Sequence, residues 1–479
     1  MKNYFKYTYL FISAGLILSS CTKKVDLNPT YTINGDASFT KIEDYEAALI
    51  GAYSKLKAGS YYGSLAANGF VGLPDMLSDN LFESTESLAN YTNLQRWRYT
   101  ADDANVESIW LDAYSVVQQA NLTLRNIDKL SAANPGGVNR VKGQALALRA
   151  LAHFDLLRYF GEDYDRASTK MGIPYVEKYD IEQKPARLTV AATLAKIEAD
   201  LKTAKQLMSN MDRDIQSLSG TSSSDRAYID TLVVDAMLAR MYNYSGVSES
   251  AIQYGSIVID SRPLAGKSVF PLIWQDASTE EVIWSVKFES GNSGIGDNIY
   301  YVTGNRASYQ PTQNLLALYD QNSDIRFTSY FQEIDKNGLR LVLSKYLAKQ
   351  PYLSNPDGVV DFKVFRTGEM YLIRAEAYAK LSNDVMALTN LNALRTARGE
   401  NAGTETGAAL MTAIFNERRI ELVAEGHRFF DLKRTTRTVD RTTDCSNFCY
   451  LPPSAREWNF PIPQSEITAN PNMKQNPGY

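Results

Sequence analysis

Apolar side chains recur at helical spacing over most of the chain, and Gly, Pro and Asn separate one periodic segment from the next. This pattern predicts a mainly α-helical protein. The stretches between the helices carry turn residues and only short β-type runs, so we expect loops with a few short strands there. Helices are predicted near 41–57, 105–130, 138–160, 190–209, 228–244, 248–260, 367–381, 384–398 and 408–425, and the loop-rich stretches are 58–104, 161–188, 262–365 and 435–479.

Two of the predicted helix pairs follow a pattern typical of tetratricopeptide repeats, in which small residues let two antiparallel helices approach closely. The pair at 371–395 matches it at Tyr371, Ala375, Tyr378, Ala387 and Leu391. The pair at 235–263 has the same nine-residue offset between Tyr242 and Ala251, although Gly255 stands where the pattern has Phe.

Two further pairs complete the predicted scaffold. The Ala-rich segment 138–160 can pack against 190–209, and 41–57 can pack against 105–130. The fold class that we predict is therefore mainly α, with four tetratricopeptide-like hairpins packed against an irregular, loop-rich half. Chance helical hairpins could mimic two of the repeats.

The first twenty residues have the features of a secretory signal. Lys2 and Lys6 are followed by an almost wholly apolar segment, 7–18, which is too short to span a bilayer. The run Leu18-Ser19-Ser20-Cys21 matches a bacterial lipobox, in which Cys21 is acylated and becomes the first mature residue. We therefore predict a signal peptide at 1–20, a lipidated tether at 21–40 and one domain at 41–479. An ordinary secretory signal with an accidental cysteine is the alternative.

Two cysteines remain once Cys21 is assigned to the anchor. Cys445 and Cys449 are four residues apart in a polar segment of an exported protein, where an oxidising compartment favours a disulfide. Free thiols are the alternative. A metal site is not expected, because two thiolates lack nearby His or Cys to complete a tetrahedron.

One predicted helix, 408–425, carries an arginine on its apolar face. Arg418 lies seven residues after Met411 on that face, and an unpaired buried charge would cost several kcal/mol. Glu417 and Glu421 are within reach on the same helix. We therefore predict a structural ion-pair network that ties this helix to its neighbours, rather than a cluster of catalytic residues.

Charge and motif content limit the classes of function. The formal net charge is −4 and no long Lys/Arg run is present, which argues against nucleic acid as a partner. Common nucleophile, zinc-protease and nucleotide-binding motifs are missing, and His153 lies in an Ala/Leu-rich helix. We therefore expect a binding protein without cofactor or metal, and not an enzyme. A surface glycosidase that uses paired carboxylates is the enzymatic alternative.

Several motifs, in order along the chain, resemble the SusD/RagB family of nutrient-binding lipoproteins of Bacteroidota. The longest is Ile414-x-x-Glu417-Arg418-Arg419-x-Glu421-Leu422, which continues through Glu425-Gly426-His427-Arg428 to Asp431-Leu432-Lys433-Arg434. The tail resembles the family too, with Phe460-Pro461-Ile462-Pro463 and Gln475-Asn476-Pro477-Gly478-Tyr479. Further matches are Trp110 with Ala120-Asn121, 149–161, 281–284 and 371–377, so the resemblance covers the whole chain.

The resemblance implies a single α-rich domain whose repeat scaffold would comprise 41–57, 105–260 and 367–425. It also implies a surface lipoprotein of the outer membrane that captures glycan for a SusC-like TonB-dependent transporter. The lipid anchor would hold it on the membrane, facing the exterior, although the residues after Cys21 leave a periplasmic face open. The peptide-binding lid of such a transporter and a scaffold that binds only proteins are the alternatives, and the particular glycan or peptide cannot be read from the sequence.

Sugar binding needs flat aromatic faces and planar hydrogen-bonding groups, so we expect the ligand site in the insertions 58–104 and 262–365. Trp97 is the leading candidate for a stacking platform, because Arg96-Trp97-Arg98-Tyr99 alternates stacking and donor groups. The other candidate ligand contacts are Arg96, Arg98, Tyr61, Tyr62, Asp75, Asn80, Asn298, Tyr300, Tyr301, Arg306 and Tyr309.

Overall fold

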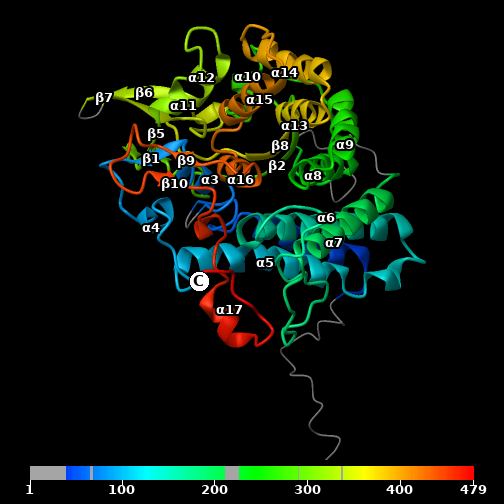
Figure 1. Cartoon of the computed structure of the whole chain (residues 1–479). Coiled ribbons are helices and arrows are strands. Elements are labelled where there is room, and N and C mark those ends of the chain that lie inside the picture. The colour runs from blue at the N-terminus through cyan, green and yellow to red at the C-terminus, as the bar shows by residue number, and fades with distance from the viewer. Residues whose placement is uncertain (1–38, 65–67, 211–225, 290, 336–337) are drawn as a thin grey trace, which may run out of the picture. The chain divides into compact units, whose positions relative to one another are not determined.

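The computed structural model describes residues 39–64, 68–210, 226–289, 291–335 and 338–479 (Figure 1). The predicted signal peptide, the acylation site at Cys21 and nearly all of the predicted tether lie outside the described residues. The chain divides into two compact units, Met1–Tyr45 and Glu46–Tyr479. In the described part of the first unit, the carboxylate of Asp44 accepts a hydrogen bond from the backbone N–H of Thr40 at 2.9 Å.

The second unit is built on a continuous array of helices. Neighbours along this array pack in the order α5, α6, α7, α8, α9, α13 and then both α14 and α15 (Figure 1). These helices match the segments that periodicity predicted, with ends shifted by a few residues. The long helices are α2 (Ile42–Lys55), α5 (Ala104–Leu124), α6 (Pro135–Phe160), α7 (Val190–Leu207), α8 (Thr231–Tyr244), α9 (Ser248–Ser261), α13 (Thr367–Lys380), α14 (Asp384–Arg398) and α15 (Gly407–Glu421).

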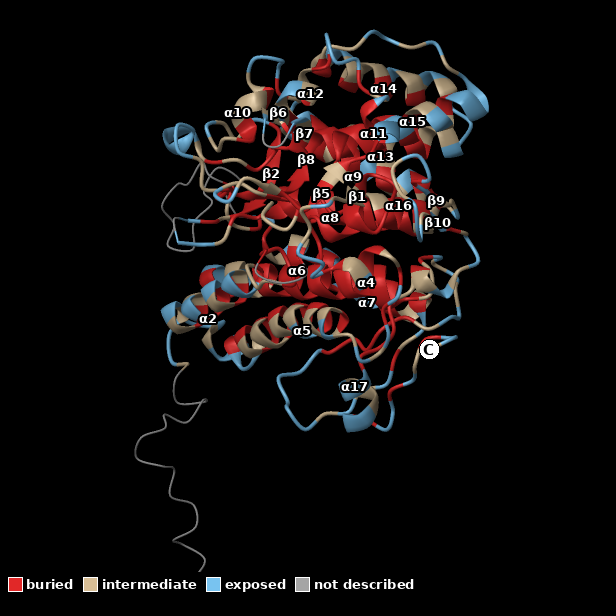
Figure 2. Cartoon of the chain, turned by 90° about the vertical axis from the view of Figure 1, so that its left-hand side faces the viewer, coloured by how far each residue is buried: buried red, intermediate tan, exposed pale blue. Residues whose placement is uncertain are grey.

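Helix α6 shows how the sequence sets this packing. Asn134 caps its start by accepting a hydrogen bond from the N–H of Gly137 at 2.9 Å, and Pro135 occupies the first turn, where no N–H is needed. Its C-terminal two thirds are buried all round, as Figure 2 shows. A Cβ at Gly143 would lie 2.5 Å from Cγ of Met208, so the glycine permits the close approach of the segment after α7.

The hairpin of α13 and α14 is formed by the residues that the repeat pattern identified. Ala375, Ala387 and Leu391 form one fully buried cluster with Leu410 and Ile414 of α15. Tyr378 packs against this cluster, which is the position that the repeat pattern gives it. The third helix therefore closes the hairpin's apolar face.

Two predicted helices end earlier than expected. The predicted helix 105–130 stops at Leu124, because Asn126 adopts a left-handed conformation with φ of 62° before the short turn η1 (Ile127–Leu130). The predicted helix 408–425 stops at Glu421, and Gly426 follows with φ of 81°. A Cβ at Gly426 would lie 2.2 Å from the carbonyl oxygen of Phe70, so only glycine fits there.

The loop-rich half contains short two-stranded antiparallel ribbons. Such ribbons are marginal alone, so they depend on packing against the helices. The pairs are β1 (Leu81–Glu83) with β5 (Tyr309–Pro311), β2 (Val282–Val286) with β8 (Phe362–Arg366), β3 (Tyr300–Tyr301) with β4 (Arg306–Ala307), β6 (Phe331–Asp335) with β7 (Leu339–Leu343), and β9 (Val439–Asp440) with β10 (Tyr450–Leu451).

Short helices connect these ribbons. None of the helices in the described ranges combines the length and hydropathy needed to cross a bilayer. The short helices are α3 (Leu73–Met76), α4 (Thr92–Gln95), α10 (Phe270–Ile273), α11 (Gln313–Leu316), α12 (Ile325–Tyr330), α16 (Arg428–Arg434) and α17 (Gln464–Ala469), with 3-10 turns η2 (Gln350–Tyr352) and η3 (Arg456–Trp458).

Candidate ligand-binding site

Trp97 does not offer its ring to solvent, which contradicts its predicted role as a stacking platform. The side chain is 7% exposed, and its indole N–H donates to the carbonyl of Leu77 at 3.0 Å. The guanidinium of Arg441 lies over the ring, 4.3 Å from its centroid. The backbone φ of 52° at Trp97 is left-handed, so Arg96, Trp97 and Arg98 do not alternate along an extended strand.

Tyr61 and Tyr62 are core residues, so their predicted ligand contacts are also wrong. Both are almost fully buried and their rings stack at 4.4 Å. Their hydroxyls donate to the same carboxylate oxygen of Asp155, at 2.8 and 2.9 Å. Asp155 also pairs with Arg158 on the same helix, so the two tyrosines satisfy a buried charge.

Asp75 and Asn80 are likewise buried rather than available to a ligand. The Asn80 amide donates to Oδ1 of Asp75 at 2.6 Å, and its own oxygen accepts from Nε of Arg419 at 2.7 Å. Burial raises the pKa of Asp75 to about 7. The neighbouring Asp79 pairs with Arg428 at 2.7 Å. These residues join α3 to α15 and α16, which no local sequence signal revealed.

Three predicted ligand residues do meet, in a small surface pocket of about 40 Å³. Asn298, Arg306 and Tyr309 line it from the second insertion. The segment before α4 supplies the opposite wall, where the hydroxyl of Tyr91 donates to Oδ1 of Asn298 at 3.3 Å. The remaining lining residues, which the sequence interpretation missed, are Ser87, Leu88, Asn90, Asp297 and Ser308.

The two tyrosines of β3 take different positions beside this pocket. Tyr300 is 5% exposed and packs with Ala307 and Val342, and its hydroxyl donates to the Asn305 side chain at 3.1 Å, so its ring is not available for the predicted ligand contact. Tyr301 is half-buried, with the Arg306 guanidinium 5.1 Å from its ring centroid. Tyr301 therefore orients Arg306 at the pocket wall.

The pocket provides mixed hydrogen-bonding chemistry. Burial raises the pKa of Asp297 to about 6, so this carboxyl can carry a proton in mildly acidic solution and both donate and accept. Asn298 offers an amide and Arg306 a guanidinium. This combination suits hydroxyl-rich ligands, because each sugar hydroxyl can donate one hydrogen bond and accept others.

The two arginines beside Trp97, Arg96 and Arg98, have different partners and exposure. Arg96 pairs with Glu83 at 3.3 Å across α4. Arg98 is exposed, and its guanidinium lies 5.5 Å from the ring centroid of Phe448. Phe448 belongs to the loop that Cys445 and Cys449 close with a disulfide. The aromatic residues beside that disulfide, Phe448 and Tyr450, were a signal in the sequence that the interpretation left unused.

A larger pocket of about 470 Å³ lies outside the predicted insertions, between α5, the loop 174–185 and α17. Its aromatic residues are not free: Trp110 is 2% exposed, and the Tyr114 hydroxyl donates to the carbonyl of Pro174 at 2.7 Å. Its volume suits a small ligand better than the volume of the 40 Å³ pocket does. The side chains of the smaller pocket are nevertheless better suited to sugar binding, so it is the candidate site. The larger pocket is the alternative.

Both histidines, His153 and His427, are buried. His153 is buried, with Nδ1 2.8 Å from the carbonyl of Arg149 and Nε2 accepting from the N–H of Val176 at 3.0 Å. Both ring nitrogens therefore have hydrogen-bond partners. Burial lowers the pKa of His153 to about 3, so the ring stays neutral. Burial and neighbouring arginines also lower the pKa of His427. Within the described ranges, no three His, Cys, Asp or Glu side chains are grouped to hold a metal ion.

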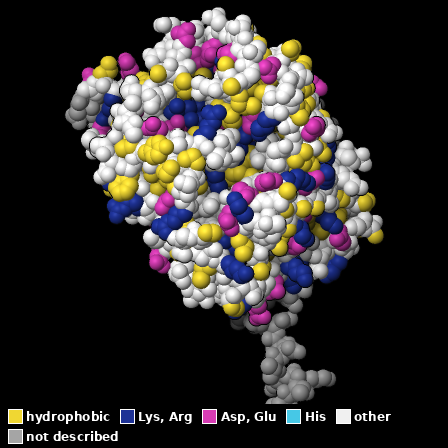
Figure 3. All heavy atoms as spheres, viewed as in Figure 1, with side chains coloured by type: hydrophobic (Ala, Val, Ile, Leu, Met, Phe, Trp, Pro, Cys, Tyr) yellow, Lys and Arg dark blue, Asp and Glu magenta, His cyan; other side chains and the backbone are white. Residues whose placement is uncertain are grey.

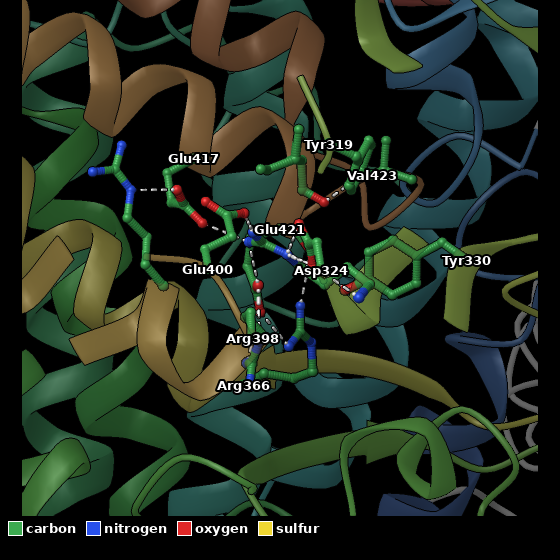
Figure 4. A network of polar contacts seen from close by, with 12 residues as sticks. Tyr319, Asp324, Tyr330, Arg366, Arg398, Glu400, Glu417, Glu421 and Val423 are labelled. Atoms are coloured by element: carbon green, nitrogen blue, oxygen red, sulfur yellow. Dashed lines mark hydrogen bonds and ion pairs between the residues drawn. The ribbon is translucent and has the colours of Figure 1, made fainter. Parts of the chain in front are cut away.

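A buried ion network joins the helical scaffold to the loop-rich half (Figure 4). Glu421 at the end of α15 accepts hydrogen bonds from Arg366 of β8 at 2.9 Å and from Arg398 of α14 at 2.9 Å. Glu417 accepts from Arg326 of α12 at 2.6 Å. The three arginines have no solvent exposure, so each depends on these carboxylates.

Arg418 has different partners from those that the sequence suggested. It pairs with Asp431 of α16 at 2.7 Å and lies 3.7 Å from Glu369 of α13, rather than pairing with the acids of its own helix. Glu417 and Glu421 serve the arginines of other elements instead. Sequence spacing identified the acids and the arginine of α15 but could not show that α12, β8 and α14 supply the opposite charges.

The fold defines a class: a tetratricopeptide-like helical array that carries a loop-rich half, which is the fold of the SusD superfamily. A SusD superfamily protein from Bacteroides thetaiotaomicron has this fold with a TM-score of 0.80, at 24% identity over 91% of this chain and 100% of that one. A putative sugar binding protein from Bacteroides vulgatus superposes with a TM-score of 0.77, at 28% identity over 92% of this chain and 99% of that one.

The sequence comparisons agree with the fold. The family model of the SusD family matches residues 340–479, and a SusD-like model described as "Starch-binding associating with outer membrane" matches residues 57–232. SusD-like protein P38 of Formosa agariphila is 25% identical over 90% of this chain and 92% of its own length. These findings confirm the resemblance to the SusD/RagB family.

Proposed function

We propose that this chain is a lipid-anchored, glycan-binding protein of the outer membrane that passes its ligand to a SusC-like TonB-dependent transporter. The observation that carries the proposal is the pocket of Tyr91, Asn298, Arg306 and Tyr309, which places amide, guanidinium and aromatic groups on the loop-built half. The description of one matching family model as starch-binding supports the ligand class. The sugar-binding title of a 28% identical structure supports it further.

Binding to a panel of soluble starch, laminarin, xylan, polygalacturonate and casein peptides, measured by isothermal titration, tests the proposal. We expect at least one polysaccharide to bind, and Asn298→Ala with Arg306→Ala to weaken that binding by about tenfold or more, because each substitution removes a hydrogen-bonding group at the site. Ile181→Ala in the larger pocket is the matched control and should leave affinity unchanged.

Three other outcomes would change the proposal, each in a different way. Binding of casein peptides alone would favour the peptide-binding lid. Affinity that falls with Ile181→Ala, and not with the Asn298 and Arg306 changes, would move the ligand to the larger pocket. Release of reducing sugar from the bound polysaccharide would overturn binding without catalysis.

The anchor is tested separately, by Cys21→Ser. Several acyl chains, at about 0.8 kcal/mol per buried CH₂, would hold the protein on the membrane. We expect the variant to move from the membrane pellet to the soluble fraction after cell lysis. Cys445→Ser is the matched control, because it removes a cysteine without touching the lipobox, and it should stay in the pellet. A Cys21→Ser protein that also stays in the pellet would refute the lipid anchor.

A further inference from the structure

The β9–β10 ribbon exposes two aromatic rings at its tip. The disulfide between Cys445 and Cys449 closes a five-residue loop there. Phe448 is 43% exposed and Tyr450 is 53% exposed. Phe448 also has φ of 56°, a left-handed conformation that is costly for a bulky side chain and that recurs at functional sites. Both rings therefore present aromatic surface to solvent.

A buried arginine holds this tip, the loop 445–450, in place through hydrogen bonds to backbone carbonyl groups. Arg441, which is fully buried, donates to the carbonyl oxygens of Met76 at 2.9 Å, Ser78 at 3.1 Å and Phe448 at 3.2 Å. Its guanidinium rests on the ring of Trp97. Trp97 therefore supports the tip through Arg441 instead of meeting a ligand itself, and the tip is ordered before any ligand arrives.

Arg98 adds a polar group beside the rings. It is exposed, lies 5.5 Å from the Phe448 ring centroid, and has no carboxylate within ion-pair distance in the described part of the chain. An arginine in this state keeps its donors for neighbouring ligand oxygens. Figure 3 shows hydrophobic side chains gathered next to Lys and Arg on the left of this face, where Figure 1 places β10 and α4.

The short helix α4 connects these residues to the candidate pocket. Tyr91, which lines the pocket, immediately precedes α4, and Arg98 follows three residues after its last residue, Gln95. The pocket wall and the tip are therefore fixed to the same segment. An extended ligand could contact both without any rearrangement of the chain.

We propose that Arg98, Phe448 and Tyr450 form a second glycan subsite, the hairpin platform, which stacks on a further pyranose ring of a polysaccharide held at the pocket. This inference rests on the proposed function. Its chemistry selects for long chains, because a short oligosaccharide occupies the pocket alone while a polymer also reaches the platform. The rings supply the apolar stacking faces and Arg98 supplies donors to adjacent hydroxyls.

The test compares Phe448→Ala/Tyr450→Ala with Tyr352→Ala, which removes an equally exposed tyrosine (53%) from η2. The probes are the polysaccharide from the panel that the wild type binds, and the disaccharide of its repeating linkage. We expect the double variant to lose about tenfold or more in affinity for the polymer and to change little toward the disaccharide, while Tyr352→Ala changes neither. Equal melting temperatures of the variants would show that folding is intact.

Removing the disulfide between Cys445 and Cys449 is a second, independent test of the platform. Cys445→Ser/Cys449→Ser keeps both rings but removes the covalent closure of the loop, so affinity for the polymer should fall by a smaller factor, since the tip must then be ordered on binding. Wild-type affinity in the Phe448/Tyr450 double variant would overturn the platform while leaving the pocket and the proposed function intact. No binding of any polysaccharide by the wild type would overturn both proposals.

Discussion

Replacing Arg366 by methionine should lower the free energy of unfolding by about 3–5 kcal/mol. Its guanidinium donates to Glu425 at 2.8 and 2.6 Å, to Glu281 at 2.7 Å and to Glu421 at 2.9 Å, and all four side chains are buried. Removing the arginine leaves three buried carboxylates short of a partner, and the apolar replacement cannot compensate them. Urea denaturation followed by circular dichroism measures the change.

The matched control is Lys196→Met, which breaks a pair with Glu177 at 2.8 Å between side chains that are 46% and 45% exposed. Solvent screens such a pair, so the expected loss is below about 1 kcal/mol. A loss of similar size in the two variants would mean that the buried network does not depend on Arg366. The expected contrast follows from burial, since the distances in the two pairs are alike.

The second large effect concerns pH and Asp75. The pKa of this carboxyl is raised to about 7 by burial, against roughly 3.9 in an unfolded chain. The folded state therefore binds this proton more tightly than the unfolded state. The stability that it contributes is complete below about pH 4 and is lost as the pH rises through about 7. At about 1.36 kcal/mol per pKa unit, the loss is on the order of 4 kcal/mol.

Asp75→Asn should abolish this dependence. We expect the variant to be at least as stable as the wild type at pH 8, and the stability difference between the two proteins to change most between pH 4 and pH 7. Thermal denaturation at a series of pH values measures it. A difference that stays constant across this range would show that Asp75 titrates normally. Glycan affinity at pH 8 should be unchanged, because Asp75 lies in the interior and not at the pocket.

The helical scaffold could be predicted because periodicity reports directly on helix packing. Ala375 and Ala387 stand at the small positions of the repeat pattern, and the structure buries them in one cluster. The same reasoning failed where helices end. Asn126 and Gly426 adopt left-handed conformations that stop α5 and follow α15, and these depend on tertiary neighbours such as Phe70.

The ligand surface could be predicted only in part, because an irregular loop has no period that separates inward from outward side chains. Trp97 and Arg98 are adjacent, yet one supports a buried arginine and the other is exposed. Tyr61 and Tyr62 matched the composition of a sugar site but satisfy Asp155. Asn298, Arg306 and Tyr309 reached the pocket because the short β3–β4 and β1–β5 ribbons hold them at its wall.

The last stretch of the chain also constrains how the protein is made. The amide of Asn476 donates to the carbonyl of Phe160 at 2.9 Å, across 316 residues of sequence, and Arg187 donates to the Asn476 side chain at 2.8 Å. A ribosome that adds about 5–20 residues per second needs roughly 16–60 s to cover that interval. Throughout that time the C-terminal end of α6 lacks its hydrogen bond from Asn476. Export before folding, or protection by a chaperone, therefore suits this architecture.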